Sequence, residues 1–174
     1  AGPSYSERMS GNLPKRPNPR ILTGLATLAF VALFGVSIGT ARSQSLIKEG
    51  WHEGAEGYQR ALEESKTSQR PLAVYFYTDW CGYCRKLERD VLTQPPMKPC
   101  LSSVIAVKVN PENGPQERDL ARKFMVSSFP RFFISRPGTG VDTNIPNATK
   151  APEGTTRLKS SEEFAADCQK AIGS

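Results

Sequence analysis

Residues 72–84 read LAVYFYTDWCGYC, an apolar run followed by two cysteines that are separated by two residues. The run from Leu72 to Tyr77 is rich in aromatic and β-branched residues and predicts a buried strand. Apolar side chains then recur at helical spacing, at Cys84, Leu87, Val91 and Leu92. The second segment therefore predicts an amphipathic helix that opens at the cysteine pair, so the chain favours an α/β fold with its chemistry at a strand-to-helix junction.

Cys81 and Cys84 are spaced for reversible disulfide chemistry. Positions i and i+3 share one face of a helix, so the two sulfur atoms can form a bond. The unpaired backbone N–H groups of the first turn favour a thiolate there; Arg85 and Lys86 would add to this field, whereas Asp79 would oppose it. We expect an exposed Cys81 to attack the sulfur of a partner and Cys84, one turn deeper, to resolve the mixed disulfide.

Two other interpretations of the pair are a permanent structural disulfide and half of a zinc site. A zinc site usually takes four ligands, often from a second matched pair. The remaining candidate ligands are scattered along the chain, at His52, Cys100 and Cys168. The pattern favours a redox-active pair, and we expect neither a metal nor an organic cofactor.

Three segments of the chain resemble the thioredoxin fold family: TDWCGYCRK at 78–86, VIAVKVN at 104–110 and VSSFPRFF at 126–133. The resemblance covers about residues 50–172 and implies a three-layer α/β sandwich around a central mixed sheet of about four strands. It is nearest to the C-terminal domains of thiol:disulfide interchange proteins, which begin with a tryptophan and an amphipathic helix, here residues 51–68. The Gly-Tyr dipeptide between the cysteines is similar to that of periplasmic disulfide isomerases.

The resemblance also implies the substrate groove. In the family a cis-proline begins the strand that faces the cysteine pair, and Pro130 occupies this position; an ordinary trans proline is the alternative. A proline there lets an extended peptide pair beside the disulfide. Trp80, Gly82 and Tyr83 would line the same groove. Phe129 is bulkier than the usual residue before this proline and would either contact a substrate or narrow the groove.

One departure from the family concerns proton transfer. Thioredoxins carry a buried aspartate six residues before the first cysteine, where it helps to deprotonate the second; this chain has Tyr75 there. Lys108 falls where the family often has a lysine beside that aspartate, and without the acid it would be a solvated side chain. The group that receives the proton of Cys84 is therefore not identified by the resemblance.

The segment from Ile21 to Thr40 contains no charged residue and is rich in Leu, Ala, Val and Phe. At about 1.5 Å per residue, a helix of this length matches the hydrocarbon core of about 30 Å. Residues 1–20 hold four basic residues and one acidic, half of the net charge of +6, so the positive-inside rule places the N-terminus in the cytoplasm. A cleaved signal peptide, with a small-residue site at 39–41, is the alternative.

These segments predict four parts: a flexible N-terminal segment (1–20), a membrane-spanning signal anchor (21–40), a linker (41–50) and one thioredoxin-like domain (51–174). Within the domain we expect helices at 51–68, from the cysteine pair to Pro95, at 115–124 and from Ser160. Strands are expected at 72–77, 104–109 and 131–135, with a last edge strand at 155–158. Residues 136–153, rich in Pro, Gly, Asn and Thr, predict a hairpin or a contact loop. No basic stripe with interleaved aromatic residues indicates nucleic-acid binding.

Cys100 and Cys168 are expected to lie on one side of the sheet, because the resemblance places them after the second helix and within the last one. They would form a second, structural disulfide, or else remain free thiols. The acceptor motif for glycosylation at 147–149 carries little weight without a eukaryotic secretory route. His52 is expected to be a surface residue of the first helix.

Together these features predict a single-pass protein of a bacterial inner membrane, with a periplasmic thiol:disulfide oxidoreductase domain that acts on protein thiols or disulfides through Cys81 and Cys84. A membrane-bound donor would supply the reductant. The alternative is a thioredoxin-like accessory subunit of a larger membrane complex, with little or no redox turnover. The sequence does not distinguish a reductase from an oxidase or an isomerase.

Overall fold

The computed structural model describes residues 45, 47 and 50–173. The predicted span at 21–40 and the segment at 1–20 lie outside these residues, so both stay predictions. Among the described residues, no helix combines the length and the apolar character that are needed to cross a membrane.

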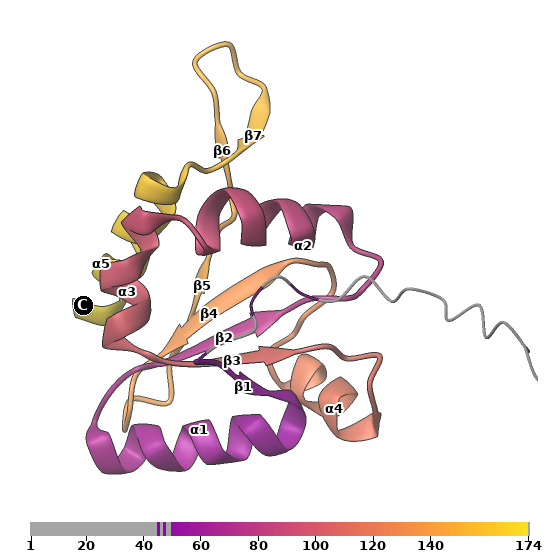
Figure 1. Ribbon diagram of the computed structural model, residues 1–174, viewed down its shortest axis with the longest axis vertical. Coiled ribbons are helices and arrows are strands. Elements are labelled where there is room, and N and C mark those ends of the chain that lie inside the picture. The colour runs from indigo at the N-terminus through magenta and orange to yellow at the C-terminus, as the bar shows by residue number, and fades with distance from the viewer. Residues whose placement is uncertain (1–44, 46, 48–49, 174) are drawn as a thin grey trace, which may run out of the picture. The chain divides into compact units, whose positions relative to one another are not determined.

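The described residues form a central sheet that is covered by helices on both faces (Figure 1). The elements are β1 (His52–Glu53), α1 (Gly54–Ser68), β2 (Leu72–Phe76), α2 (Gly82–Leu87), a π-helical segment (Glu88–Leu92), a 3-10 turn (Pro95–Met97), α3 (Lys98–Ser103), β3 (Ile105–Val109), α4 (Pro115–Lys123), β4 (Arg131–Ser135), β5 (Asp142–Ile145), β6 (Ala148–Lys150), β7 (Thr156–Leu158) and α5 (Ser161–Gly173).

The central sheet is mixed and has the strand order β1-β3-β2-β4-β5. β1 and β2 each run parallel to β3, whereas β4 pairs antiparallel with both β2 and β5. The predicted three-layer α/β fold is confirmed. The sheet has five strands and not about four: β1 and β5 form its two edges, and the strand expected at 155–158 does not belong to it.

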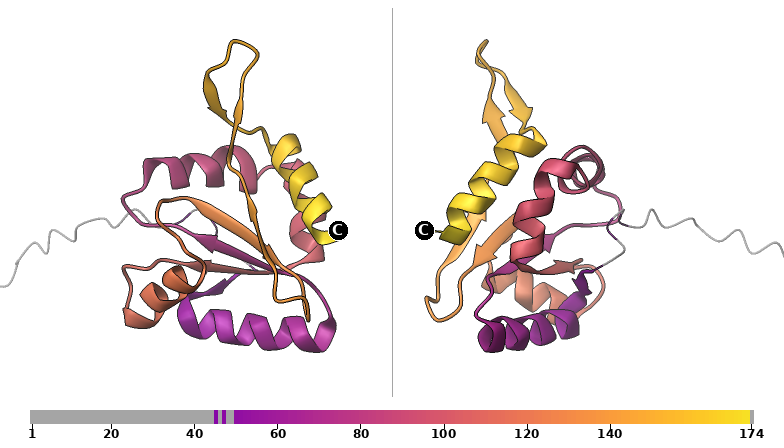
Figure 2. Two further views of the ribbon diagram at one scale, coloured as in Figure 1. Left: turned by 180° about the vertical axis from the view of Figure 1, so that it is seen from behind. Right: turned by 60° about the vertical axis from the view of Figure 1, so that its left-hand side comes forward.

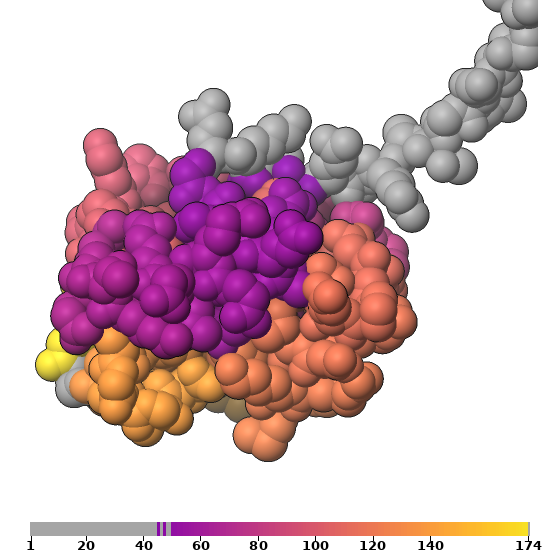
Figure 3. Space-filling model, turned by 90° about the horizontal axis from the view of Figure 1, so that it is seen from below, coloured from indigo at the N-terminus to yellow at the C-terminus, as the bar shows by residue number. Residues whose placement is uncertain are grey.

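Two apolar clusters hold the layers together, one on each face of the sheet. Since side chains alternate along a strand, Tyr75 of β2 faces α2, α3 and α5, while Phe76 faces α1 and α4. All five residues of β2 are buried, as are all five of β3. Figure 3 views the molecule from the side of α1 and α4, which lie next to each other on the face opposite α2.

The first helix begins three residues later than the sequence predicts. His52 and Glu53 pair with Val107 and Lys108 of β3, so they are a short edge strand and not a helical turn. Gly54 then adopts a φ of +70°, which suits a glycine and redirects the chain into α1. Trp51 consequently lies before β1, where its ring packs edge-on against Tyr75 at 6.3 Å between centroids.

The segment between β4 and α5 contains two hairpins. In the first, β5 (Asp142–Ile145) pairs with β4 at the edge of the central sheet. In the second, Thr156–Leu158 pairs with Ala148–Lys150 in a separate two-stranded ribbon. The expected edge strand at 155–158 is therefore not part of the central sheet. Figure 2 shows the β6–β7 hairpin projecting beyond α2 and α5.

The last helix begins with a capping box formed by Ser160 and Glu163. The Ser160 hydroxyl accepts a hydrogen bond from the Glu163 N–H at 3.3 Å, and the Glu163 carboxylate accepts one from the Ser160 N–H at 2.8 Å. This reciprocal capping box satisfies two backbone donors at the start of α5. The helix thus begins directly after the hairpin.

Candidate functional site

Cys81 and Cys84 are joined by a disulfide at the start of α2, with 5.2 Å between their Cα atoms. Cys81 is the N-cap residue, and its Sγ accepts a hydrogen bond from the backbone N–H of Cys84 at 3.1 Å. The exposed fractions are 4% for Cys81 and 1% for Cys84. The expectation of an exposed Cys81 is wrong for this oxidised form, because its sulfur is turned toward Cys84 and its backbone.

Exposed aromatic side chains border the disulfide. Trp80, directly before Cys81, is 65% exposed, and Tyr83, directly before Cys84, is 74% exposed. The Trp80 ring packs edge-on against Phe129, with 6.4 Å between centroids. Large apolar groups left in solvent beside a reactive bond are typical of a surface that binds another protein.

The segment that faces this surface begins β4. The peptide bond between Phe129 and Pro130 is cis, as the resemblance implies, and Pro130 is buried. Phe129 is half-buried and packs against both apolar clusters, so its ring is a fixed part of the wall beside Trp80. The Asn147 side-chain amide donates a hydrogen bond to the Pro130 carbonyl at 3.4 Å, which gives this residue of the glycosylation motif a structural contact.

Arg85 lies over the first turn of α2. Its guanidinium donates a hydrogen bond to the carbonyl oxygen of Asp79 at 2.9 Å. A Cβ atom placed on Gly82 would lie 3.9 Å from the same guanidinium. The guanidinium of Arg85 is thus held close to the first turn of α2, where a positive charge favours the thiolate form of a cysteine.

Tyr75 lies beneath the disulfide, where the resemblance leads one to expect an aspartate. Its side chain is fully buried, and its hydroxyl donates a hydrogen bond to the carbonyl oxygen of Cys84 at 3.4 Å. Burial, followed by the charge of Glu88 and a hydrogen bond with it, raises the pKa of Tyr75 well above its usual range. Tyr75 is therefore a protonated hydroxyl that contacts the backbone of the second cysteine.

Lys108 is a buried side chain and not the solvated one that the sequence predicts, and the residue across from it on β2 is Tyr75 and not an acid. It lies across from Tyr75 in the β2–β3 register and is 7% exposed. Its Nζ lies 3.5 Å from Oε2 of Glu53, and Oε1 of the same carboxylate accepts a hydrogen bond from the Tyr77 hydroxyl at 3.4 Å. Burial, then the charge of Glu53, raises the pKa of Tyr77 above its usual range.

Glu88 is the residue of this site that the sequence did not single out. It is 1% exposed, and the hydroxyl of Ser45 donates a hydrogen bond to its Oε1 at 3.1 Å. Its spacing of four from Cys84 places it on the buried face of the helix, which is the signal that could have found it.

Cys100 and Cys168 form a second disulfide, with 6.1 Å between their Cα atoms. Both side chains are fully buried, and the bond joins α3 to α5. The described residues leave no free cysteine. Both cysteines of this second disulfide are 0% exposed, whereas the first disulfide lies next to the exposed rings of Trp80 and Tyr83.

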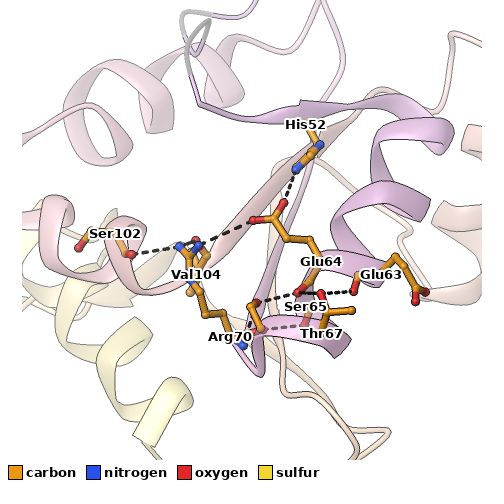
Figure 4. Close-up of polar contacts among 9 residues, drawn as sticks. His52, Glu63, Glu64, Ser65, Thr67, Arg70, Ser102 and Val104 are labelled. Atoms are coloured by element: carbon orange, nitrogen blue, oxygen red, sulfur yellow. Dashed lines mark hydrogen bonds and ion pairs between the residues drawn. The ribbon is translucent and has the colours of Figure 1, made fainter.

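His52 takes part in a polar network with Glu64 and Arg70 (Figure 4). Its Nε2 lies 3.2 Å from the carboxylate of Glu64 on α1, and Arg70 lies 3.8 Å from the same carboxylate. Arg70 also donates to the carbonyl oxygens of Ser102 and Val104. The network joins the ends of α1 and α3. Within the described part of the chain, no group of three or more His, Cys, Asp or Glu side chains is placed to hold a metal ion.

Comparison with known proteins shows which family the sequence belongs to. A sequence model described as thioredoxin-like matches residues 51–137, half of the chain. The chain belongs to the thioredoxin-like family. The matched region contains the cysteine pair, Tyr75, Glu88 and the Phe129–Pro130 segment.

Among curated proteins, the chain is 29% identical over 126 residues to the thioredoxin-like protein HCF164, chloroplastic, of Arabidopsis thaliana, which covers 72% of this chain and 46% of that protein. It is 29% identical over 79 residues to the thiol:disulfide interchange protein DsbD 1 of Pseudomonas aeruginosa, covering 45% of this chain and 13% of that protein. The chain spans less than half the length of either relative.

Among solved structures, a thioredoxin from Thermus thermophilus superposes with a TM-score of 0.52 at 21% identity, covering 70% of this chain and 86% of that one. A DsbH oxidoreductase superposes with a TM-score of 0.52 at 17% identity, covering 94% and 95%. At these identities the likeness establishes a shared fold.

Proposed function

We propose that this protein is a thiol:disulfide oxidoreductase that exchanges disulfides with other proteins through Cys81 and Cys84. The observation that carries the proposal is the disulfide at the start of α2, bordered by the exposed rings of Trp80 and Tyr83 and faced by Phe129. A single reversible bond beside a protein-binding surface is what such an exchange requires. The names of the relatives support the same kind of activity.

The proposed reaction, written in the reducing direction, has two steps. The Cys81 thiolate attacks one sulfur of a substrate disulfide, which forms a mixed disulfide and releases the other substrate sulfur as a thiolate. The Cys84 thiol then loses its proton, attacks Sγ of Cys81 and releases the second substrate thiolate. Two electrons pass from the cysteine pair to the substrate, and the two released thiolates take up protons. Sulfur carries all the electrons, so the proposed reaction uses no metal or organic cofactor.

We place the reaction outside the cytoplasm, on a domain that is tethered to a bacterial inner membrane by residues 21–40. The buried disulfide between Cys100 and Cys168 supports an oxidising compartment, because such bonds are rare where thiols are kept reduced. The uncharged run at 21–40 and the basic residues before it support the tether. A membrane-bound thiol donor would then restore the reduced pair after each turnover.

Trapping of mixed disulfides tests the proposal. Cys84→Ser leaves the attacking sulfur and removes the resolving one, so substrates should accumulate as disulfide-linked adducts in intact cells. Cys81→Ser is the matched control and should capture none. The reduction potential of the pair, measured against glutathione, then separates a reductase from a donor of disulfides.

A thioredoxin-like accessory subunit of a larger membrane complex is the second candidate. The β6–β7 hairpin favours it, because this ribbon projects from the domain and pairs with no strand of the central sheet (Figure 2). Stoichiometric co-purification with a membrane complex, together with no trapped adduct from Cys84→Ser, would select this candidate over the oxidoreductase.

A further inference from the structure

A pocket lies on the face of the sheet opposite the cysteine pair. It is formed by α1, the end of α4 and the turn that joins β4 to β5, on the side of the molecule that Figure 3 shows. Its volume is about 260 Å³. Pockets for drug-sized ligands measure about 300–1,000 Å³, so this one suits a small ligand.

The pocket also lies at the far end of β2 from the disulfide. Leu72 and Ser135, which line it, are paired at the start of β2 and the end of β4. Cys81 follows the opposite end of β2, after Phe76. The strand covers about 13 Å between these ends, at about 3.3 Å per residue. The pocket is therefore a separate site and not an extension of the surface beside Trp80.

Apolar side chains line the pocket from both the helix and the turn. Leu72 and Tyr58 are buried members of the apolar cluster on the α1 and α4 side of the sheet, and Leu62 of α1 packs against the same cluster. Val141 of the β4–β5 turn also lines the pocket and is 52% exposed. A ligand with an apolar body can therefore cover aliphatic and aromatic surface that water now touches.

The charged side chains of the pocket are mainly basic. Lys66, Lys123 and Arg136 line it, together with one carboxylate, Asp142. That carboxylate already accepts a hydrogen bond from the Ser135 hydroxyl. Basic groups in a cleft with walls of low dielectric constant attract anions more strongly than the same groups on an open surface. The pocket therefore favours a ligand with a negative charge.

Arg136 has a guanidinium that is open to an anion. It is half-buried, and within the described part of the chain its guanidinium makes no hydrogen bond or ion pair. By contrast, Nζ of Lys66 lies 3.5 Å from the carboxylate of Glu63. The backbone carbonyl of Arg136 accepts hydrogen bonds from the N–H and the hydroxyl of Thr139, which hold the turn in place. An arginine offers a planar fork of N–H donors that matches the two oxygens of a carboxylate.

Tyr58 adds a buried hydroxyl to the same pocket. Its oxygen accepts a hydrogen bond from Nζ of Lys123 at 3.1 Å, and that Nζ also lies 5.2 Å from the centre of the ring. The hydroxyl has one proton to donate, and no acceptor for it is found among residues 45, 47 and 50–173. Tyr58 is 3% exposed, and buried donors are normally paired. An oxygen atom of a ligand would supply the missing acceptor.

We propose that this pocket binds a small organic anion, with a carboxylate among the donors of Arg136, Tyr58 and Lys123 and an apolar body against Leu62 and Val141. The apolar walls favour such an acid over a bare inorganic anion. A free carboxylic acid and the C-terminal residue of a peptide present the same chemistry, and the experiment distinguishes them. The inference does not rest on the proposed exchange reaction, because the pocket contains neither cysteine of the redox pair.

The test compares each acid with its neutral amide. The isotope-labelled full chain, in a nonionic detergent, is titrated with benzoate and with benzamide, and backbone amide shifts are followed by NMR. N-acetylphenylalanine and its amide repeat the comparison for a peptide end, and inorganic phosphate tests a charge without an apolar body. Shifts should cluster at residues 58–66 and 135–142. At least one acid should bind about tenfold more tightly than its amide and than phosphate, and the tighter of the two acids identifies the source.

Substitutions in the pocket should remove the preference for the charged ligand. Arg136→Gln should weaken binding of the acid about tenfold and leave that of the amide unchanged. Tyr58→Phe keeps the ring and removes one donor, so it should weaken binding of the acid about threefold. Arg60→Gln is the matched control, because Arg60 is an exposed arginine of α1 that pairs with Glu56 and does not line the pocket. This variant should bind like the parent.

Several outcomes would overturn the inference. They are equal affinities of the parent protein for acid and amide, no binding of either acid, shifts that lie outside the two segments, and an unchanged affinity in Arg136→Gln and Tyr58→Phe when circular dichroism shows that both are folded. None of these results bears on the proposed exchange reaction, which the trapping experiment with Cys84→Ser decides separately.

Discussion

The indole N–H of Trp80 donates a hydrogen bond to Oε1 of Glu112 at 2.7 Å. Glu112 follows β3, and its own N–H donates to the side chain of Asn110, which is 2% exposed. A ring that is 65% exposed is thereby fixed in orientation beside Cys81 by a contact to the neighbouring loop. The surface next to the disulfide is ordered before a substrate arrives.

Removal of this contact should weaken the reaction with protein substrates. In Glu112→Ala the Trp80 ring can rotate, and the loss of one exposed hydrogen bond of about 1 kcal/mol corresponds to about a fivefold lower kcat/KM in insulin reduction. The reaction with a small disulfide, which does not need the ring, should be unchanged. Glu112→Gln keeps an acceptor and should retain most of the activity. An equal loss with both kinds of disulfide would contradict a role in substrate binding.

The disulfide between Cys100 and Cys168 should contribute to stability and not to turnover. The two residues are 68 positions apart, and closing a loop of this length stabilises a folded protein by about 4 kcal/mol in the chain-entropy model. The double substitution to alanine should lower the free energy of unfolding by about this amount in a urea titration, while the rate of insulin reduction at low temperature stays the same. Loss of the exchange reaction in a folded double variant would show that the second pair takes part in it.

The position of the cysteine pair was predictable from the sequence, because it depends on residues that are close together in the chain. The buried run of β2 and the cysteine spacing place Cys81 and Cys84 at a strand-to-helix junction without any knowledge of distant contacts. Pro130 was assigned through the resemblance, and the cis bond at that position agrees. These features depend on a few adjacent residues.

The rest depended on tertiary contacts that periodicity does not reveal. Trp51 fits a helical pattern, yet His52 and Glu53 are held as a strand by β3. Asp142–Ile145 lies in the stretch that the sequence predicts as a hairpin or a loop, but its polar residues do not show that it pairs with β4 in the central sheet. The sequence assigned no role to Glu88, since nothing in the local sequence shows that Ser45 and Tyr75 converge on it.

Tyr75 should make the fold sensitive to alkali. Burial, with Glu88 next in effect, raises the pKa of Tyr75 above its unfolded value of 10.0, so the folded state keeps a proton that the unfolded state loses. The free energy of unfolding should therefore be constant below about pH 9 and fall above about pH 10, by up to about 1.4 kcal/mol per pH unit for this group.

Chemical denaturation at a series of pH values measures this slope. Tyr75→Phe should reduce the alkaline slope by up to one proton, whereas Tyr83→Phe, at an exposed ring, is the control substitution. An alkaline slope that is the same in Tyr75→Phe and in the parent would show that the Tyr75 hydroxyl ionises equally in both states.

The β6–β7 hairpin should loosen in acid because of one ion pair. The two terminal guanidinium nitrogens of Arg157 on β7 donate to the carboxylate of Glu163 on α5, at 2.7 Å each. These bonds, followed by the bond from the Ser160 N–H, lower the pKa of Glu163 to about 2. A carboxyl whose pKa is lowered on folding stabilises the folded state above its unfolded value of 4.5, and this contribution is lost as the pH falls toward 2.

Hydrogen exchange, referred to the amides of β2, measures the effect. Protection of the hairpin amides should fall relative to β2 as the pH is lowered below about 4, and Glu163→Gln should show the low protection already at neutral pH. Glu56→Gln, at an exposed ion pair on α1, should leave the hairpin unchanged. Because Glu163 also caps α5, the first turn of that helix should lose protection together with the hairpin. A hairpin that keeps its protection in Glu163→Gln would mean that the β6–β7 pairing alone holds it in place.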